Sequence, residues 1–149
     1  MIEINNLTAS FIDKELLKRV AQIVLKGENK KEADLSIVFV GEGRIKKINR
    51  KYRKKDRVTD VLAFGQSQES KVKSQKFPIL PKKELELGEL VICLSEVKKN
   101  AKSSNLDSNE ELARVLIHGI LHLLGYEHEK SEKKVQEMER KQEHYLSQI

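Results

Sequence analysis

The feature that most constrains this chain is the segment HGILHLLGYEH at residues 118–128, which holds three of its four histidines. His118 and His122 lie four residues apart, so on an α-helix of about 3.6 residues per turn their imidazoles project from one face. His128 lies six residues further on and cannot share that face. Gly125, between them, accepts the positive φ that often ends a helix, so the pattern predicts a helix that stops there and a chain that turns back.

Three histidines in this arrangement predict a site for one Zn²⁺ ion. His118 and His122 would supply two nitrogen ligands from one helix face, and His128 would supply a third from the following turn. Three protein ligands leave the fourth tetrahedral position to water, as in catalytic rather than structural zinc sites. Nickel, copper or iron would also suit three imidazoles. A pair of core histidines is the alternative, but Gly125 and the third histidine favour the metal site.

The same spacing also bears on the class of reaction. The pattern H-x-x-x-H-x-x-G-x-x-H is the long zinc motif of metzincin peptidases, in which a glutamate follows the first histidine and acts as general base. Gly119 occupies that position in this chain. The metal-binding pattern is therefore present, whereas the base of a peptidase is absent from its usual place.

Basic residues are concentrated in one stretch, residues 44–57 (RIKKINRKYRKKDR), called the basic segment below. It contains nine basic residues and one acid, Asp56, for a net charge of +8; the whole chain carries +6, so the remainder carries −2. A charged stretch is often only a solvated face. A block of this size also attracts polyanions, and Tyr52 within it offers a ring for contact with a base or sugar.

The remaining composition predicts a single cytoplasmic domain covering residues 1–149. That length suits one domain with one sizeable core. Cys93 is the only cysteine, so no internal disulfide forms, and its apolar surroundings indicate a small buried side chain. The first residues resemble no secretory leader and no apolar run reaches membrane-spanning length, so no membrane association is expected.

Hydrophobic periodicity and capping residues predict four strands and five helices. The expected strands cover residues 1–5, 35–40, 61–64 and 88–94. The expected helices cover residues 14–26, 44–51, 95–103, a stretch from 108 or 109 through the histidine pair, and 131–147. Asp13 and Ser95 are the expected N-caps of two of these helices, and Gly27 the expected end of the first. Thr59 and Asp60 are interpreted as turn residues, and 65–87 as a surface loop.

Four segments, in order along the chain, resemble the successive motifs of the bacterial YbeY endoribonuclease family. They are NRKYRKKD at 49–56, TDVLAF at 59–64, LGELVI at 87–92 and HGILHLLGYEH at 118–128. The resemblance spans nearly the whole chain, and the last motif is specific. The chain departs from the family pattern at Glu89 and Glu127, where aspartate is usual, and at Ala63, where serine is common.

This resemblance implies an α+β fold: a small mixed four-stranded sheet packed with about five helices, one of which carries the metal site. It implies one Zn²⁺ held by His118, His122 and His128, with Arg53 near the metal as a catalytic residue. The implied activity is single-strand-selective cleavage of RNA in ribosomal RNA maturation and ribosome quality control. Ribosomal proteins or a ribosome-associated GTPase are the implied protein partners.

The chemistry of such a site is consistent with phosphodiester hydrolysis. Zinc lowers the pKa of bound water to about 7, so hydroxide forms without a glutamate base, and the ion also polarises a phosphoryl oxygen. Arg53 would stabilise the charge that develops on the phosphate. Two alternatives stay open: a metallopeptidase-like hydrolase with Glu127 as its base, and a ribosome-associated binding protein whose zinc is mainly structural.

Overall fold

The computed structural model describes residues 1–65, 86–126 and 131–149. Its strands are β1 (Ile2–Asn6), β2 (Asp34–Phe39), β3 (Val61–Gly65) and β4 (Glu86–Ile92). Its helices are α1 (Lys14–Gly27), α2 (Glu42–Arg53), α4 (Leu94–Ser103), α5 (Ser108–Leu123) and α6 (Glu132–Leu146). Every predicted strand and helix is therefore present within these residues. Most of the loop predicted at 65–87 lies outside them, as do Glu127 and His128.

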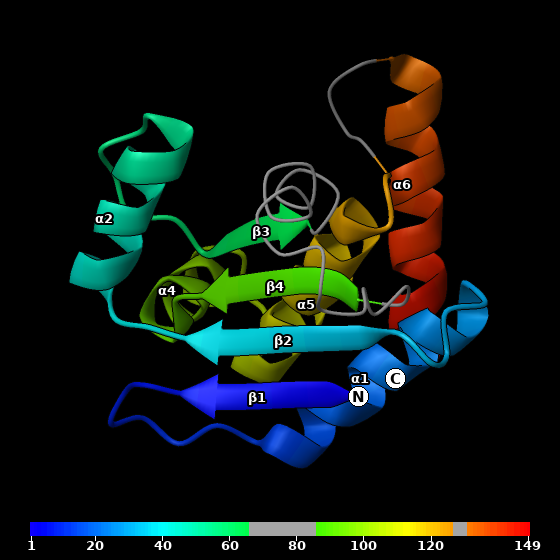
Figure 1. The fold of residues 1–149 in the computed structure, drawn as a ribbon, viewed down its shortest axis with the longest axis horizontal. Helices are drawn as coiled ribbons and strands as arrows, with labels where there is room; N and C mark the ends of the chain where they lie inside the picture. Colours follow the sequence, from blue (N-terminus) through cyan, green and yellow to red (C-terminus); the bar gives the residue numbers. More distant parts are fainter. Residues whose placement is uncertain (66–85, 127–130) are drawn as a thin grey trace, which may run out of the picture.

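The four strands form one mixed sheet in the order β1-β2-β4-β3 (Figure 1). Strand β2 pairs in parallel with both β1 and β4, whereas β3 pairs with β4 in the antiparallel direction. The predicted α+β fold with a small mixed sheet is thus confirmed. Strand β3 lies at one edge of the sheet, so one side of its backbone is available to groups other than a neighbouring strand.

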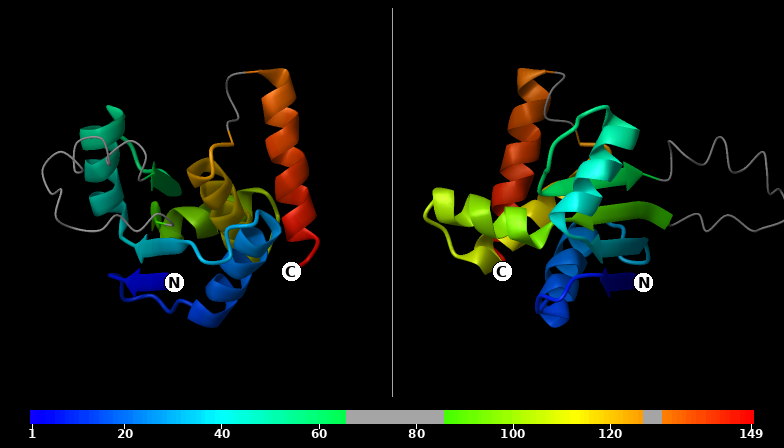
Figure 2. Two further views of the ribbon diagram at one scale, coloured as in Figure 1. Left: turned by 45° about the vertical axis from the view of Figure 1, so that its right-hand side comes forward. Right: turned by 90° about the vertical axis from the view of Figure 1, so that its left-hand side faces the viewer.

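Side chains that alternate along the strands divide the core into two parts. Leu35, Ile37 and Phe39 of β2 face a large core shared with α1, α4, α5 and α6. Val38 and Val40 face a smaller cluster that α2 covers through Ile45. Figure 2 shows the consequence: α2 lies on one side of the sheet, and α5 and α6 lie on the other. Within the described residues, no helix combines the length and apolar character needed to cross a membrane.

Helix α5 packs directly against the sheet. Most of its residues between Leu112 and Leu121 are buried. It lies close to the sheet at Gly119, where an added Cβ would lie 2.8 Å from Cδ2 of Leu90 in β4. The helix begins after Asp107, whose side chain accepts a hydrogen bond from the backbone N–H of Asn109 (3.0 Å).

The C-terminus of α5 confirms the predicted role of Gly125. Its φ is +100°, in the range that favours glycine. The N–H of Gly125 donates to the carbonyl of His122, and the N–H of Tyr126 donates to that of Leu121, each at 3.0 Å. This pair of bonds is the Schellman motif, which satisfies carbonyls left without helical partners and turns the chain away from the helix axis.

One predicted helix boundary needs correction, and one confirmed boundary has a different physical cause. Helix α4 begins at Leu94 with Cys93 as N-cap, and Ser95 lies inside its first turn, where its hydroxyl donates to Glu42 Oε1 (3.1 Å). Helix α1 does end at Gly27, but its backbone becomes left-handed only at Asn29 (φ 59°). Glycine is required at 27 for a packing reason, because an added Cβ would lie 2.5 Å from Cε1 of Tyr145.

A cluster of polar side chains around Glu28, called the Glu28 cluster, joins three separate segments. The Glu28 carboxylate accepts hydrogen bonds from the Tyr126 hydroxyl (2.5 Å), the Lys141 ammonium (3.1 Å) and the Tyr145 hydroxyl. Burial alone would raise the pKa of Glu28, but these hydrogen bonds outweigh it and lower that pKa. Burial and the carboxylate together raise the pKa of Tyr126 to about 12. The cluster fixes α6 against the end of α1 and the turn after α5.

We expect Glu28→Gln to lower the free energy of unfolding at pH 7 by roughly 1–3 kcal/mol, the usual range for hydrogen bonds to a charged group. Because the folded-state pKa is lowered from 4.5, the contribution of the carboxylate is present above pH 4.5 and disappears as the pH falls through the folded-state value. Urea unfolding at pH 7 and in acid should therefore show the two proteins converging at low pH. The exposed Glu32→Gln is the matched control, and an equal loss in both variants would contradict the prediction.

Candidate active-site cavity

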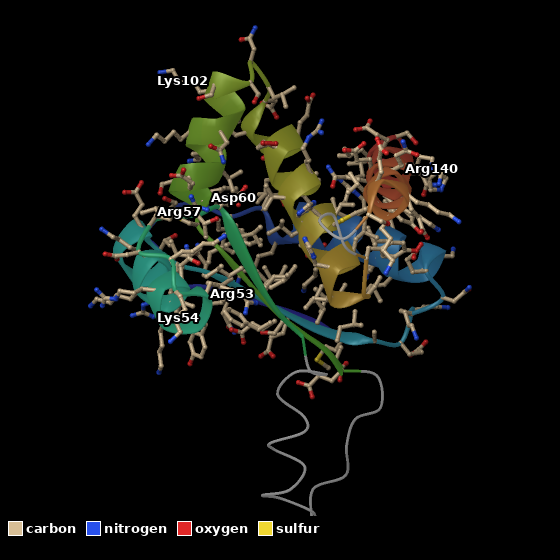
Figure 3. The ribbon with its side chains drawn as sticks, turned by 90° about the horizontal axis from the view of Figure 1, so that it is seen from above. Arg53, Lys54, Arg57, Asp60, Lys102 and Arg140 are labelled. Atoms are coloured by element: carbon tan, nitrogen blue, oxygen red, sulfur yellow. The ribbon has the colours of Figure 1, made fainter. Side chains whose placement is uncertain are left out.

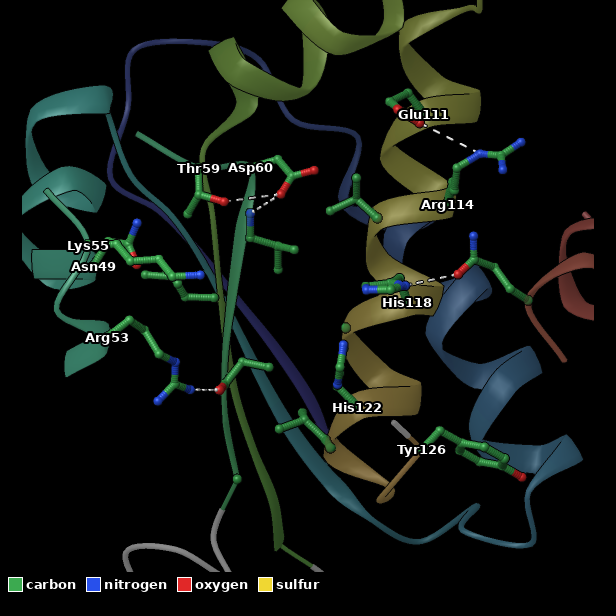
Figure 4. A pocket seen from close by; sticks show the side chains of 18 of the residues that line it. Asn49, Arg53, Lys55, Thr59, Asp60, Glu111, Arg114, His118, His122 and Tyr126 are labelled. Carbon is green, nitrogen blue, oxygen red and sulfur yellow. Dashed lines mark hydrogen bonds and ion pairs between the residues drawn. The ribbon is translucent and has the colours of Figure 1, made fainter. Parts of the chain in front are cut away.

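A cavity of about 760 Å³ lies beside β3, in contact with α2, α5 and α6. Figure 4 shows its lining side chains converging from these elements. The polar and charged residues that line it are Asn49, Arg53, Lys55, Arg57, Thr59, Asp60, Glu111, Arg114, His118, His122, Tyr126 and Gln142. Three of the four motif segments, which begin at residues 49, 59 and 118, thus contribute side chains to one site.

His118 and His122 project into this cavity from the same face of α5 (Figure 4). Their ring centroids lie 4.7 Å apart, with an angle of 78° between the ring planes, and both side chains are half-buried. The predicted convergence of the first two histidines is therefore confirmed. Imidazole nitrogens are ligands that suit Zn²⁺, so this donor pair fits the expected metal. Among the described residues no three metal-ligating side chains form a group, and His128 is outside them.

The His118 ring also contacts α6. Its Nδ1 lies 3.0 Å from Oε1 of Gln142, a residue 24 positions further along the chain. Gln142 belongs to the last helix expected from the sequence, residues 131–147, but sequence reasoning assigned it no part in the site. The signal in the sequence was that Gln142 is a polar residue at helical spacing from Met138 and Tyr145.

Arg53, the residue that the family resemblance places near a metal, lines the cavity from the end of α2. Its Nη2 donates to the carbonyl oxygen of Ala63 (2.6 Å), and its guanidinium lies 4.9 Å from the ring centroid of Phe64. Ala63 belongs to β3, which is an edge strand among the described residues, and Arg53 satisfies its carbonyl. In Figure 4 Arg53 and the histidine pair approach β3 from opposite sides.

The chain following α2 brings further positive charge to the cavity. Asn49 is buried, and its side-chain amide donates to the carbonyl of Arg57 (3.0 Å). This bond folds the segment back so that Lys55 and Arg57 line the cavity. Figure 3 shows Arg53, Lys54 and Arg57 gathered around α2 and the segment after it, with Arg140 of α6 on the far side of α5.

Acidic residues occupy the end of the cavity nearest the start of α5. Glu111 is buried; burial raises its pKa, Arg114 opposes this rise, and the charge of Asp60 adds to it. Arg114 lies 3.6 Å from Glu111 and 3.7 Å from Glu143. Sequence reasoning missed Glu111 and Arg114, although they precede His118 by seven and four residues and so share its helix face.

Thr59 and Asp60 have the turn role predicted for them. The Asp60 carboxylate accepts hydrogen bonds from the backbone N–H of Val61 (2.8 Å) and from the Thr59 hydroxyl (3.5 Å). Both residues also line the cavity. Among the residues that the structure describes, four basic side chains (Arg53, Lys55, Arg57 and Arg114) and two acidic ones (Asp60 and Glu111) line it, so this part of the site has an excess of positive charge.

An exposed aromatic side chain lies beside the cavity. Tyr52 is 51% exposed, and its ring packs edge-to-face on Phe64 with the centroids 5.4 Å apart. The ammonium of Lys51 lies 5.2 Å from the centroid of the Tyr52 ring. The basic segment therefore presents the Tyr52 ring, which packs on Phe64 and lies next to the Lys51 ammonium. By contrast, the fourth histidine, His144, lies exposed on α6.

Comparison with known proteins places these features in a family. The family model described as endoribonuclease YbeY matches residues 3–149. The endoribonuclease YbeY of Persephonella marina is 41% identical over 127 residues, covering 85% of this chain and 77% of that protein. That of Thermodesulfovibrio yellowstonii is 36% identical over 140 residues, covering 94% and 80%. The solution structure of TM1509 from Thermotoga maritima is 31% identical, with a TM-score of 0.63, covering 99% of this chain and 87% of that one. With the motifs and the mixed sheet, these matches establish that the chain belongs to the YbeY endoribonuclease family.

Proposed function

We propose that this protein is a zinc-dependent endoribonuclease that hydrolyses phosphodiester bonds in single-stranded RNA. The observation that carries this proposal is the cavity, which is lined, among the described residues, both by two imidazoles of α5 and by four cationic side chains. Imidazoles suit a catalytic metal, and the cations suit a polyanionic substrate. Family membership supports the same activity.

The metal ligands in this proposal are His118, His122 and His128. When bound, Zn²⁺ supplies a Lewis acid for a phosphoryl oxygen and lowers the pKa of water. The protein's own contribution is to hold the first two imidazoles at fixed separation on a buried helix and to direct the chain toward the third through Gly125. No glutamate base is needed after the first histidine.

Arg53 is the proposed catalytic residue for the scissile phosphate. Its guanidinium is held by the Ala63 carbonyl and the Phe64 ring, so it is oriented before substrate binds. A donor oriented in advance stabilises developing negative charge without reorganisation in the transition state. The rest of the basic segment would bind the RNA backbone, and Tyr52 would stack on an unpaired base.

Unpaired RNA fits this surface better than a duplex does. A base can stack on the exposed Tyr52 ring only if it is not already stacked and paired within a helix. We propose that the protein acts in the cytoplasm, in ribosomal RNA maturation and ribosome quality control, because it belongs to this family. Ribosomal proteins or a ribosome-associated GTPase are the protein partners that this role would require.

The peptidase alternative is disfavoured by the packing of α5. In a peptidase of this motif, the residue after the first histidine carries the carboxylate base. Here that residue is Gly119, and a side chain at this position would be directed at the buried Leu90. A glutamate there would therefore meet the core of the sheet rather than substrate. A ribosome-associated protein with structural zinc would instead need a fourth protein ligand.

The activity is tested by incubating the zinc-loaded protein with single-stranded RNA and with casein, each with and without a chelator. We expect cleavage of RNA alone, lost with chelator and restored by Zn²⁺. His122→Ala should lose both bound zinc and RNA cleavage, because two imidazoles hold the ion far less tightly. The exposed His144→Ala, on α6, should retain both. Casein cleavage would support a peptidase, and full zinc occupancy in His122→Ala would contradict the ligand assignment.

Gly125→Val should weaken zinc binding while the sheet stays folded. A β-branched residue at φ +100° is strained by about 1–3 kcal/mol, so the chain would leave α5 along another path. Zinc affinity by chelator competition and secondary structure by circular dichroism provide the measurement. Gly41→Val is the control, since Gly41 has extended backbone and open space around it. Equal zinc affinity in both variants would show that Gly125 does not direct the third ligand.

Arg53→Ala and Lys46→Ala should separate catalysis from binding. Loss of a preorganised donor to transition-state charge typically slows turnover on the order of a hundredfold, so Arg53→Ala should reduce the single-turnover rate at saturating RNA. Lys46 is exposed and outside the cavity, so Lys46→Ala should weaken binding and lower the salt dependence by about one counterion. Rates and affinities across a salt series provide the comparison. Proportional losses of rate and binding in both variants would remove the catalytic role of Arg53.

A further inference from the structure

We propose that Gln142 is a positioning residue for His118, holding the imidazole in the tautomer that carries its proton on Nδ1. The Nε2 lone pair is then directed into the cavity. This inference rests on the proposed function in one respect, namely that His118 is a zinc ligand. It assigns to α6 a part in the site that neither the motifs nor the family name specify.

The geometry of one hydrogen bond assigns the tautomer. The Gln142 atom that faces the ring is Oε1, 3.0 Å from Nδ1 of His118. A carbonyl oxygen only accepts hydrogen bonds, so Nδ1 must be the donor and must carry the proton. In a neutral imidazole the other nitrogen then holds the lone pair. In Figure 4 the His118 ring projects from α5 toward β3, and its dashed hydrogen bond leaves on the opposite side.

The backbone of α6 at Gln142 is held in place by contacts of the residues on both sides of it. Lys141, the preceding residue, binds Glu28 (3.1 Å), and Glu143, the following residue, lies 3.7 Å from Arg114 of α5. One turn away in each direction, Met138 and Tyr145 are buried in the core, each 2% exposed. Helix α6 is thus fixed against α1 and α5, so the backbone of Gln142 stays within reach of His118.

Such a hydrogen bond has a known consequence for metal ligation. A histidine that donates its second N–H to an acceptor is fixed in both tautomer and ring orientation, and its metal-binding nitrogen becomes more basic. Removing the acceptor typically weakens metal affinity or activity by about 10–100-fold. His118 and Gln142 are both half-buried, so water competes poorly for this hydrogen bond.

The test uses Gln142→Met, which keeps the length of the side chain but removes the acceptor, and Gln142→Glu, which keeps an acceptor oxygen. Gln136→Met, at an exposed position of the same helix, is the matched control. Two properties are measured at about pH 8, above the ordinary range of imidazole titration. The first is the tautomer of His118 in the metal-free protein, from ¹⁵N-edited NMR of the imidazole. The second is Zn²⁺ affinity by competition with a chelator.

We expect the unchanged protein and Gln142→Glu to show the Nδ1–H tautomer, and Gln142→Met to shift toward Nε2–H. Zinc affinity should fall about 10–100-fold in Gln142→Met and stay close to the original value in Gln142→Glu and Gln136→Met. An Nε2–H tautomer in the unchanged protein would overturn the proposal. So would a Gln142→Met variant that keeps the Nδ1–H tautomer and full zinc affinity.

The two readouts separate this proposal from the proposed function. If the unchanged protein bound no Zn²⁺, the proposed metal site would fail, while the NMR measurement would still decide what Gln142 does to His118. If zinc bound tightly but the tautomer did not depend on Gln142, the metal site would stand and the positioning role would be overturned.

Discussion

The rest of the structure depends on how helix α5 packs against the sheet. The contact between Gly119 and Leu90 brings the helix close to β4, and the apolar residues between Leu112 and Leu121 are buried around it. Burying this surface is strongly favourable, so the helix has little freedom to rotate or slide. Its remaining face, with His118 and His122, is consequently presented at a fixed place beside β3. The rigidity that a metal site needs is supplied by packing rather than by the polar residues themselves.

The other parts of the site are assembled around this helix by different interactions. On the β3 side, the open carbonyl of an edge strand orients Arg53, and the amide of Asn49 directs the basic residues after α2 into the cavity. On the opposite side, α6 brings Gln142 to His118. These elements carry mostly charged surface, and their polar contacts fix the position of individual side chains. Hydrophobic packing sets the scaffold, and hydrogen bonds set the geometry of the site.

Local sequence patterns were sufficient for the elements and for the histidine pair. The four-residue spacing, the apolar face of α5 and the glycine at 125 are all short-range signals, and the structure bears each of them out. Ser95 was wrongly predicted as the N-cap of α4 because serine is a favoured N-cap residue, but Cys93 occupies that position. Gln142 and Glu28 were missed for a different reason. Their roles arise from partners distant in the chain or from the packing of whole helices, which periodicity does not encode.

The Glu28 cluster connects the two sides of the histidine helix. Its carboxylate binds Tyr126, the residue directly after the Gly125 turn, and also Lys141 and Tyr145, which flank Gln142 on α6. A single half-buried acid therefore anchors both the chain that leaves α5 and the helix that contacts His118. Because a charged group with three donors is costly to separate from them, these two segments are constrained to move together. The geometry at His118 is thus set partly by a residue at the end of α1, outside the cavity that it supports.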